Sequence, residues 1–376
     1  METNTPQQTA SSNHDRVVKL SKQGNRLFKE KRYREALALF EEALALEPHN
    51  PYILTGLGDT LRVLKNFYRA ADCYHEVLAK DPHNLFALRG LGDTYRGQHK
   101  IEKALELWER YIKFRPRDIF VLTRIADGYK TIGNHQRAEE CYQQALNINP
   151  DDRYALMGLA DLYQKTGQND LAILHYEQVL SKGPTLINIL TIVGNLYWRR
   201  GEPEKARDYY EKALEQESHN SYALYGLGNY YRLRQDYPKA ISQWEKILER
   251  DRGTINMLTR LADAYRKMER FDEAEKIYLQ NLEEGYDKFS LLGLAKLHAT
   301  RNEMDEMIRC YRELVDKEEE DGWFFSEIAT KLLDNSQFQE AAQLYRVACE
   351  LQGDHPEVRQ KLAEQAEKHQ LSPNTN

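Results

Sequence analysis

The chain has 376 residues, of which 41% are hydrophobic and 30% charged, and its formal net charge is −6. Lys and Arg are spread along the chain rather than gathered into a basic stripe, which argues against nucleic acid as a partner. No stretch approaches roughly eighteen uninterrupted apolar residues, so the sequence predicts no membrane insertion. The four cysteines lie far apart without a CxxC or CxxH pair, so it predicts no metal site.

In chain order, the first segment is polar and carries no apolar run. We expect residues 1–16 to form a disordered tail without a signal peptide, which places the protein in the cytoplasm. From Val17 the sequence repeats with a period of 34 residues, except that the eighth unit has 33. The ten units begin at Val17, Pro51, Leu85, Ile119, Arg153, Ile187, Ser221, Ile255, Lys288 and Gly322.

Each unit has the pattern of a helical hairpin. Counted from the first residue of a unit, position 8 is Gly or Ala, position 24 is aromatic, and position 20 is Ala except at Met307. Small residues allow two helices to approach closely, and the aromatic ring fills the space beside their crossing. Pro at position 32 of the first five units ends the second helix. Each unit is therefore predicted to form helix A, a turn, helix B and a turn, and the units must stack because one hairpin cannot bury its apolar face.

This pattern resembles the tetratricopeptide repeat family over residues 17–355. The resemblance implies an all-α fold, a right-handed α-solenoid superhelix of about ten helical hairpins with helices A lining the concave face. Residues 356–370 are expected to form a capping helix, and residues 371–376 a disordered tail.

The face of helix A that is left over carries a polar ladder. Successive helical residues turn by about 100°, so positions 2, 9 and 13 lie opposite the side that packs on helix B. In the family's stack this opposite side faces the groove. Position 2 is aromatic in seven units, at Tyr52, Phe86, Phe120, Tyr154, Tyr222, Phe289 and Trp323. Position 9 reads Asn25, Asp59, Asp93, Asp127, Asp161, Asn195, Asn229 and Asp263.

Two interpretations of the ladder stay open for its acidic steps. The ladder is either a track for an extended peptide or a set of local ion pairs that contribute only about a few tenths of a kcal/mol each. The local pairs would be Asp59 with Arg62, Asp93 with Arg96, Asp127 with Lys130, and Asp263 with Arg266.

The binding interpretation is favoured for Asn195 and Asn229, because an amide both donates and accepts hydrogen bonds and, being uncharged, needs no local cation to balance it. The ladder is similar to the asparagine ladder in the repeat domain of O-linked N-acetylglucosamine transferase, which holds the backbone of substrate proteins. The match is limited to Asn25, Asn195 and Asn229, so the resemblance implies no glycosyltransferase activity.

The sequence places the strongest binding position at the sixth and seventh units. There Trp198 stands where other units carry a cation, and aromatic and Arg residues dominate binding hot spots. An alternative is that Trp198 packs under the neighbouring helix A. The predicted groove residues are Asn195, Trp198, Arg199, Tyr222, Tyr225, Asn229 and Arg232, with Asp59, Asp93, Asp127, Asp161 and Asp263 on the acidic steps.

No Ser/His/Asp or Cys/His set clusters in the repeats, so we expect no enzyme and no cofactor. The predicted function is a scaffold or adaptor that binds an extended or helical segment of a partner protein in its concave groove. One alternative is a substrate-recruiting subunit of a separately encoded enzyme such as a transferase. Another is a structural protein that self-assembles into homo-oligomers.

Overall fold

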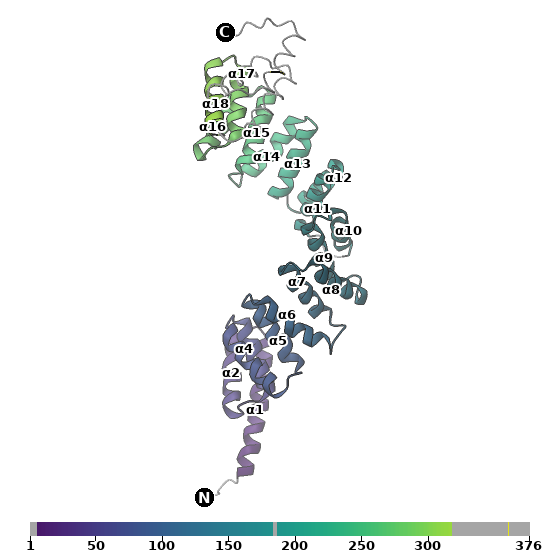
Figure 1. Ribbon diagram of the computed structural model, residues 1–376. Coiled ribbons are helices and arrows are strands. Elements are labelled where there is room, and N and C mark those ends of the chain that lie inside the picture. Colours follow the sequence, from purple (N-terminus) through teal and green to yellow (C-terminus); the bar gives the residue numbers. More distant parts are fainter. Residues whose placement is uncertain (1–5, 183–185, 318–359, 361–376) are drawn as a thin grey trace. The chain divides into compact units, whose positions relative to one another are not determined.

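The computed structural model describes residues 6–182, residues 186–317 and Gln360, and within them it contains eighteen α-helices and no strand (Figure 1). In chain order the helices are α1 (Pro6–Lys29), α2 (Tyr33–Leu46), α3 (Pro51–Val63), α4 (Phe67–Lys80), α5 (Leu85–Gly97), α6 (Ile101–Ile112), α7 (Ile119–Thr131), α8 (His135–Ile148), α9 (Arg153–Lys165), α10 (Asn169–Ser181), α11 (Ile187–Arg199), α12 (Pro203–Gln216), α13 (Ser221–Leu233), α14 (Tyr237–Leu248), α15 (Ile255–Lys267), α16 (Phe271–Glu284), α17 (Lys288–Thr300) and α18 (Met304–Lys317).

The first residues of the helices A agree with the predicted repeat. From α3 to α17, each odd-numbered helix begins at the residue that opens the second to the ninth unit. Most of these starts are set by a capping side chain, as in α5, where Asn84 Oδ1 accepts a hydrogen bond of 3.1 Å from the backbone N–H of Ala87. Such a cap satisfies one of the backbone donors that the first turn of a helix leaves unpaired.

The turn from helix A to helix B reverses the chain through one residue with positive φ. In the fourth and sixth repeats this residue is glycine, at Gly133 with φ of 83° and Gly201 with φ of 79°. Glycine adopts this left-handed conformation without the steric penalty of a Cβ atom. The two helices of a hairpin can therefore run back along each other after a very short connection.

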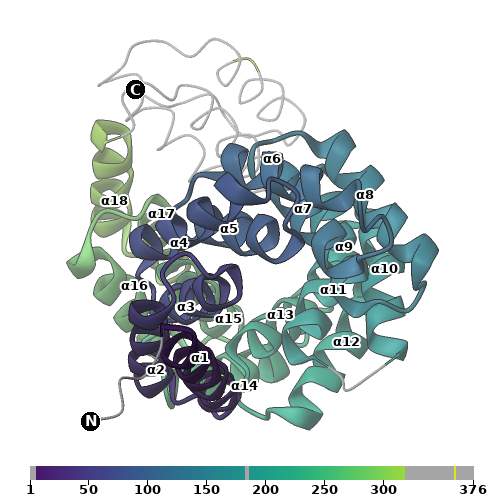
Figure 2. The ribbon, with the colours of Figure 1, turned by 90° about the horizontal axis from the view of Figure 1, so that it is seen from below.

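The chain forms two compact units, residues 1–189 and 190–376, which are described separately. Within the first unit, successive helices from α1 to α10 pack against each other, and α3 also contacts α5 (Figure 2). Within the second unit, each helix from α12 to α18 packs against the next. Sequential hairpins thus stack as a helical solenoid requires.

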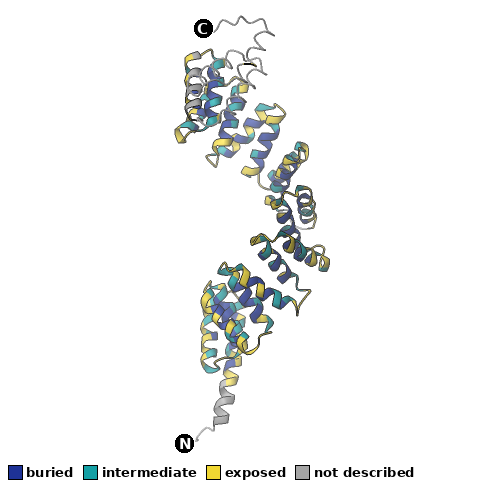
Figure 3. Ribbon diagram, viewed as in Figure 1, coloured by how far each residue is buried: buried dark blue, intermediate teal, exposed yellow. Residues whose placement is uncertain are grey.

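The core of each unit lies between the helices A and the aromatic side chains of the helices B (Figure 3). Phe40 is fully buried, and a Cβ atom added to Gly56 on the next helix A would lie 2.6 Å from its ring. The same relation joins Tyr74 to Gly90, where the distance to the ring would be 2.5 Å. Phe40 also meets Gly24, and Tyr74 meets Gly58, on the helices A of their own repeats. These two rings therefore sit against two successive helices A, which explains why small residues recur there.

The N-terminal part of the structure differs from the sequence expectation. Helix α1 begins at Pro6, whereas residues 1–16 were expected to be disordered. Among the residues of α1 whose burial is described, Val17 is the first that is buried, and His14 and Arg16 before it are exposed. Once a helix is nucleated, each added residue gains a backbone hydrogen bond, so a polar segment can extend it without an apolar face.

At the C-terminal side, the tenth unit with Trp323, the expected capping helix 356–370 and the tail 371–376 lie outside the described residues. The exception is Gln360, which is helical and exposed. In the part of the chain that the structure describes, no helix combines the length and the apolar character needed to cross a membrane.

Candidate functional site

The polar ladder of the helices A is joined to the helices B by buried tyrosines. The hydroxyl of Tyr74 donates to Asp59 over 2.7 Å, and that of Tyr210 donates to Asn195 over 2.8 Å. Burial, followed by the charge of Asp59, raises the pKa of Tyr74 far above its ordinary value, so this hydroxyl remains a donor. The same bond joins Tyr142 to Asp127, Tyr176 to Asp161 and Tyr278 to Asp263.

Two repeats replace the tyrosine by tryptophan, which has no hydroxyl to offer. At these places the ladder residue accepts instead from an arginine of the next helix A. Arg124 donates to Asp93, and Arg260 Nη1 donates to Asn229 Oδ1 over 2.8 Å. Asp93 and Asn229 are the two most buried of the described ladder residues, at 7% and 8% exposure. Every acidic or amide step from Asp59 to Asp263 therefore has an internal partner.

The local ion pairs expected along the ladder are confirmed at three of four steps. The nitrogen–oxygen distances are 3.3 Å for Arg62–Asp59, 3.5 Å for Lys130–Asp127 and 3.3 Å for Arg266–Asp263.

The fourth expected pair, Asp93 with Arg96, is wrong. Arg96 lies over the ring of Trp108, 5.9 Å from its centroid, and Asp93 pairs with Arg124 and, at 3.8 Å, with Arg62. The electron-rich face of an indole attracts a guanidinium, so tryptophan in this repeat gives Arg96 a different partner.

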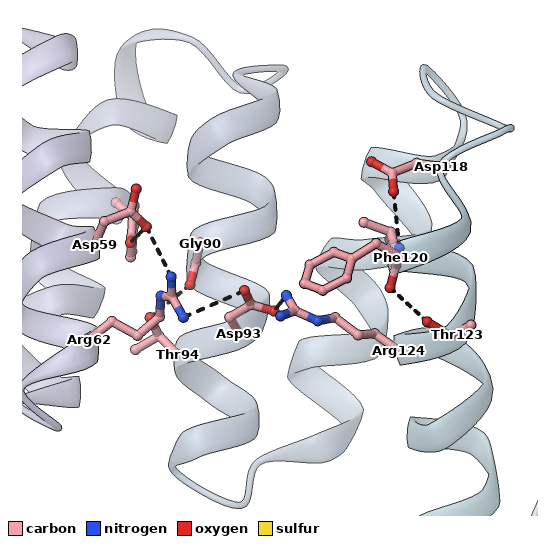
Figure 4. A network of polar contacts seen from close by, with 11 residues as sticks. Asp59, Arg62, Gly90, Asp93, Thr94, Asp118, Phe120, Thr123 and Arg124 are labelled. Atoms are coloured by element: carbon pink, nitrogen blue, oxygen red, sulfur yellow. Dashed lines mark hydrogen bonds and ion pairs between the residues drawn. The ribbon is translucent and has the colours of Figure 1, made fainter. Parts of the chain in front are cut away.

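One cation can join two steps of the ladder. Arg62 lies between Asp59 and Asp93, and Arg124 approaches Asp93 from the other side, so charges of opposite sign alternate along three helices A (Figure 4). Lys130 similarly reaches Asp161 at 3.8 Å. The acidic steps of the first unit are therefore largely neutralised by groups of the chain itself, which favours the structural interpretation of these carboxylates.

The predicted binding residues of the second unit lie on α11 and α13. On α11, Asn195 and Arg199 are exposed and Trp198 is half-buried. On α13, Tyr222 is 73% exposed, Tyr225 is half-buried and Arg232 is exposed, whereas Asn229 is buried. The oxygen of each asparagine is already occupied, by Tyr210 and by Arg260. Arg260 therefore places a cation beside Asn229, a partner that the sequence interpretation did not name.

The structure brings Tyr225 and Asn229 into one cluster with two residues of α15. The hydroxyl of Tyr225 donates to Asn256 Oδ1 over 3.1 Å, and Arg260 Nε donates to the same oxygen over 2.8 Å. Arg260 also lies over the Tyr225 ring, 5.8 Å from its centroid. Among the described residues, no hydrogen bond or ion pair joins this cluster to the predicted residues of α11.

Arg124 and Arg260 were missed by the sequence interpretation, although a signal for them was present at position 6. This position is Arg in the two repeats that follow a tryptophan at position 24. After a phenylalanine or tyrosine it is Gly, with Ile192 as an exception among the units from the second to the ninth. The glycines that follow this rule are Gly56, Gly90, Gly158, Gly226 and Gly293.

Aromatic residues at position 2 form a second feature of the helices A. Each of them is exposed in the described part of the chain, at Tyr52, Phe86, Phe120, Tyr154, Tyr222 and Phe289. Three have polar neighbours, since Asn25 donates to the Tyr52 hydroxyl over 2.8 Å, Arg124 lies 3.7 Å from the centroid of the Phe120 ring, and Lys288 lies 6.0 Å from that of Phe289. Exposed aromatic rings next to polar groups are typical of protein-binding surfaces.

The described residues offer little for catalysis. Burial raises the pKa of the Cys73 and Cys141 thiols to about 11, and that of Cys310 to about 12, so these thiols remain protonated and unreactive. No group of three or more His, Cys, Asp or Glu side chains in this part of the chain could hold a metal ion.

Comparisons with known proteins give the same repeat. Three sequence models, each described as "Tetratricopeptide repeat", match residues 194–253, residues 27–72 and 133–192, and residues 258–288, which together make up just over half of the chain. No curated protein matches the chain.

The chain is also similar to several solved structures, including the following three. The C-terminal part of a TPR repeat-containing protein from Cytophaga hutchinsonii is 18% identical with a TM-score of 0.57, covering 64% of this chain and 99% of that one. A tetratricopeptide repeat protein from Parabacteroides merdae is 19% identical, with a TM-score of 0.48 and coverage of 66% and 98%. MamA is 28% identical, with a TM-score of 0.42 and coverage of 43% and 95%. From the sequence matches, the stacked hairpins and the Cytophaga fold, the chain belongs to the tetratricopeptide repeat family.

Proposed function

We propose that this protein is a non-enzymatic scaffold or adaptor, and that its helices A bind an extended or helical segment of a partner protein. Tetratricopeptide repeats in general serve protein–protein interaction, which supports the broad role. The residues of this chain support the finer assignment to α11, α13 and α15.

The observation that carries the assignment is that Tyr222 is exposed, while Tyr225 and Asn229 on the same helix are held in place by hydrogen bonds. Tyr225 and Asn229 are fixed by Arg260 and Asn256, so the surface beside Tyr222 is ordered before a partner arrives. A rigid aromatic anchor beside a guanidinium is the usual composition of a binding hot spot, and preorganisation lowers the entropic cost of binding.

The proposed binding residues are Asn195, Trp198, Arg199, Tyr222, Tyr225, Asn229 and Arg232. Asn195 and Asn229 use their oxygens internally, so their contribution would come from the amide nitrogen, which can donate to a peptide carbonyl. The carboxylates at Asp59, Asp93, Asp127, Asp161 and Asp263 already accept from tyrosine or arginine, so we assign them a secondary role at the surface.

The experiment is capture of cross-linked partners from a native extract by the full chain and by Tyr222→Ala. Loss of an aromatic hot spot costs at least about 2 kcal/mol, or roughly thirtyfold in affinity, so capture should fall sharply. The matched control is Leu279→Ala, which truncates an exposed apolar residue on the helix B α16. Equal capture by both variants and the parent would remove Tyr222 from the binding surface.

A mass measurement over a range of protein concentrations accompanies the capture. If the captured material is only further copies of the chain and the mass rises with concentration, the protein is self-assembling and the adaptor proposal fails.

A further inference from the structure

A pocket of about 560 Å³ lies in the first unit, at the end of α6 and beside the start of α5. Phe86 and Phe114 form apolar walls, and Arg89, Arg115 and Arg117 bring three guanidinium groups to the rim. The ring of His83 lies 5.1 Å from that of Phe114 and supports it from outside. The pocket is distinct from the surface proposed on α11 and α13, so the two can be tested separately.

Arg115 and Arg117 stand in a turn that other repeats build with a carboxylate, whereas Arg89 lies on α5. In the first and second repeats the residue equivalent to Arg115 is acidic, and its carboxylate accepts from the amide of the asparagine that caps the next helix. The distances are 2.7 Å for Asn50 to Glu47 and 3.3 Å for Asn84 to Asp81. The third repeat reverses the charge at this position.

A different bond holds the turn of the third repeat. Tyr111 donates to Asp118 Oδ2 over 2.6 Å, while Asp118 Oδ1 accepts from the backbone N–H of Val121 over 3.2 Å. Burial, followed by the hydrogen bond to Asp118, raises the pKa of Tyr111, so this donor keeps its proton. The side chain of Arg115 is therefore not needed to hold the turn together.

Three guanidinium groups share this pocket with a single carboxylate, that of Asp118. Among the described residues, none of Arg89, Arg115 and Arg117 forms an ion pair, and Asp118, the acidic group in the pocket, is occupied by Tyr111 and the helix cap. This is unusual in a chain of net charge −6, where acidic residues outnumber basic ones. Uncompensated arginines around apolar walls are complementary to an anionic ligand that also has an apolar part.

We infer that this pocket binds an acidic segment of a partner protein, with an aromatic side chain of the segment between Phe86 and Phe114 and its carboxylates on Arg115 and Arg117. Arg89, which is half-buried on α5, fixes the carboxylate nearest the aromatic ring of the segment. A nucleic acid strand is the competing anionic ligand. It is disfavoured because a strand needs cations along the phosphates of several nucleotides, whereas the pocket gathers its three arginines at one place.

The test measures binding of a dansyl-labelled, amidated peptide, Glu-Glu-Trp-Glu-Glu, to the full chain by fluorescence anisotropy. Arg115→Glu and Arg117→Glu should each weaken binding by at least about tenfold, the loss expected for one charge-assisted hydrogen bond. The matched control is Lys113→Glu, which makes the same charge change on an exposed neighbour that does not line the pocket. It should change the affinity by less than about twofold.

A second measurement tests the apolar contact between the tryptophan of the peptide and Phe114. Replacing Trp of the peptide by Ala should weaken binding to the parent protein but not to Phe114→Ala, because the tryptophan then has no ring to contact. Thermal melting of each variant establishes that the fold is intact, which is expected for side chains exposed in a turn.

Three results would overturn the inference. The first is equal loss of binding in Lys113→Glu and Arg115→Glu, which would indicate general charge attraction. The second is undiminished binding of the peptide Gln-Gln-Trp-Gln-Gln. The third is failure of the acidic peptide to bind while single-stranded oligothymidylate binds through Arg115 and Arg117, which would make the pocket a nucleic-acid site. None of these results bears on Tyr222 and the proposed surface of the second unit.

Discussion

The hydroxyl of Tyr74 donates a 2.7 Å hydrogen bond to Asp59, joining the buried side of helix α4 to the polar ladder of α3. The two residues lie fifteen positions apart, and the same bond recurs at this spacing in the fourth, fifth, sixth and eighth repeats. The ladder is therefore in part a set of anchors for the core, and a carboxylate at this position is explained before any ligand is considered.

Removing this anchor should be measurable as a loss of stability. Tyr74→Phe deletes one hydrogen bond to a carboxylate without changing the packing of the ring, and should lower the free energy of unfolding by about 1 to 2 kcal/mol. Chemical denaturation monitored by circular dichroism measures this. Tyr68→Phe, on the exposed side of the same helix, is the control and should have no effect. Equal stability of all three proteins would mean that the bond contributes nothing net.

The close crossing in the fifth repeat gives a second prediction. Ala172 is fully buried, so Ala172→Leu should overpack the hairpin of α9 and α10 and cost about 1 to 3 kcal/mol. The same substitution at Ala79, an exposed residue of α4, serves as the control and should leave the melting temperature nearly unchanged. A parent-like melt of Ala172→Leu would show that the core has room there.

Arg124, which takes the place of the tyrosine hydroxyl as donor to the ladder, should contribute more to the free energy of unfolding than a surface cation does. Arg124→Ala leaves the buried carboxylate of Asp93 with Arg62 at 3.8 Å as its remaining partner. We expect a loss of about 2 to 4 kcal/mol, because a buried charge without full compensation is costly. The control, Arg69→Ala, removes an exposed pair with Glu41 and should cost less than about 1 kcal/mol.

The Arg124 prediction includes a rescue. Adding Asp93→Asn to Arg124→Ala removes the uncompensated charge and imitates the seventh repeat, where the residue is Asn229. The double variant should regain part of the lost stability, as measured by denaturant unfolding. If it is as unstable as the sum of the single variants, charge compensation is not the reason for the arginine.

Substitution of Trp198 distinguishes a role in partner binding from a role in packing. Its side chain is half-buried, so we expect Trp198→Ala to change the melting temperature little and to weaken partner capture by roughly thirtyfold, as for a hot-spot aromatic. If Trp198 instead packs as a core residue, the variant should lose several kcal/mol of stability, about 3 to 5 for a fully buried tryptophan. A stable variant that captures partners at full strength would remove Trp198 from the site.

The sequence could predict the hairpins and their first residues because both depend on local chemistry. A capping residue such as Asn84 acts over a few positions, and the recurrence of small residues such as Gly90 at a fixed place in the repeat fixes the register. The start of α1 at Pro6 was missed because a helix can continue through polar residues that carry no apolar pattern.

The partners of the ladder could not be predicted in the same way. Helical periodicity assigns a residue to a face, but it does not say which groups of the neighbouring helices reach that face. The expected Asp93–Arg96 pair was drawn from spacing within one helix, whereas the actual partner, Arg124, comes from the next repeat. The bond from Arg260 to Asn229 was missed for the same reason, because the two residues are 31 positions apart.

The exchange of tyrosine for tryptophan has a consequence for how such an array can be copied or shortened. Deleting residues 85–118 would preserve the period of 34 residues but would place Arg124 against the ring of Tyr74. In the intact chain Tyr74 packs against Gly90, which has no side chain and leaves room for the ring. The fragment that can be duplicated or deleted without such a mismatch runs from helix B of one repeat through helix A of the next. Recombination in this gene, or modular redesign of the protein, should therefore succeed at the short turns inside the hairpins and fail at the turns between them.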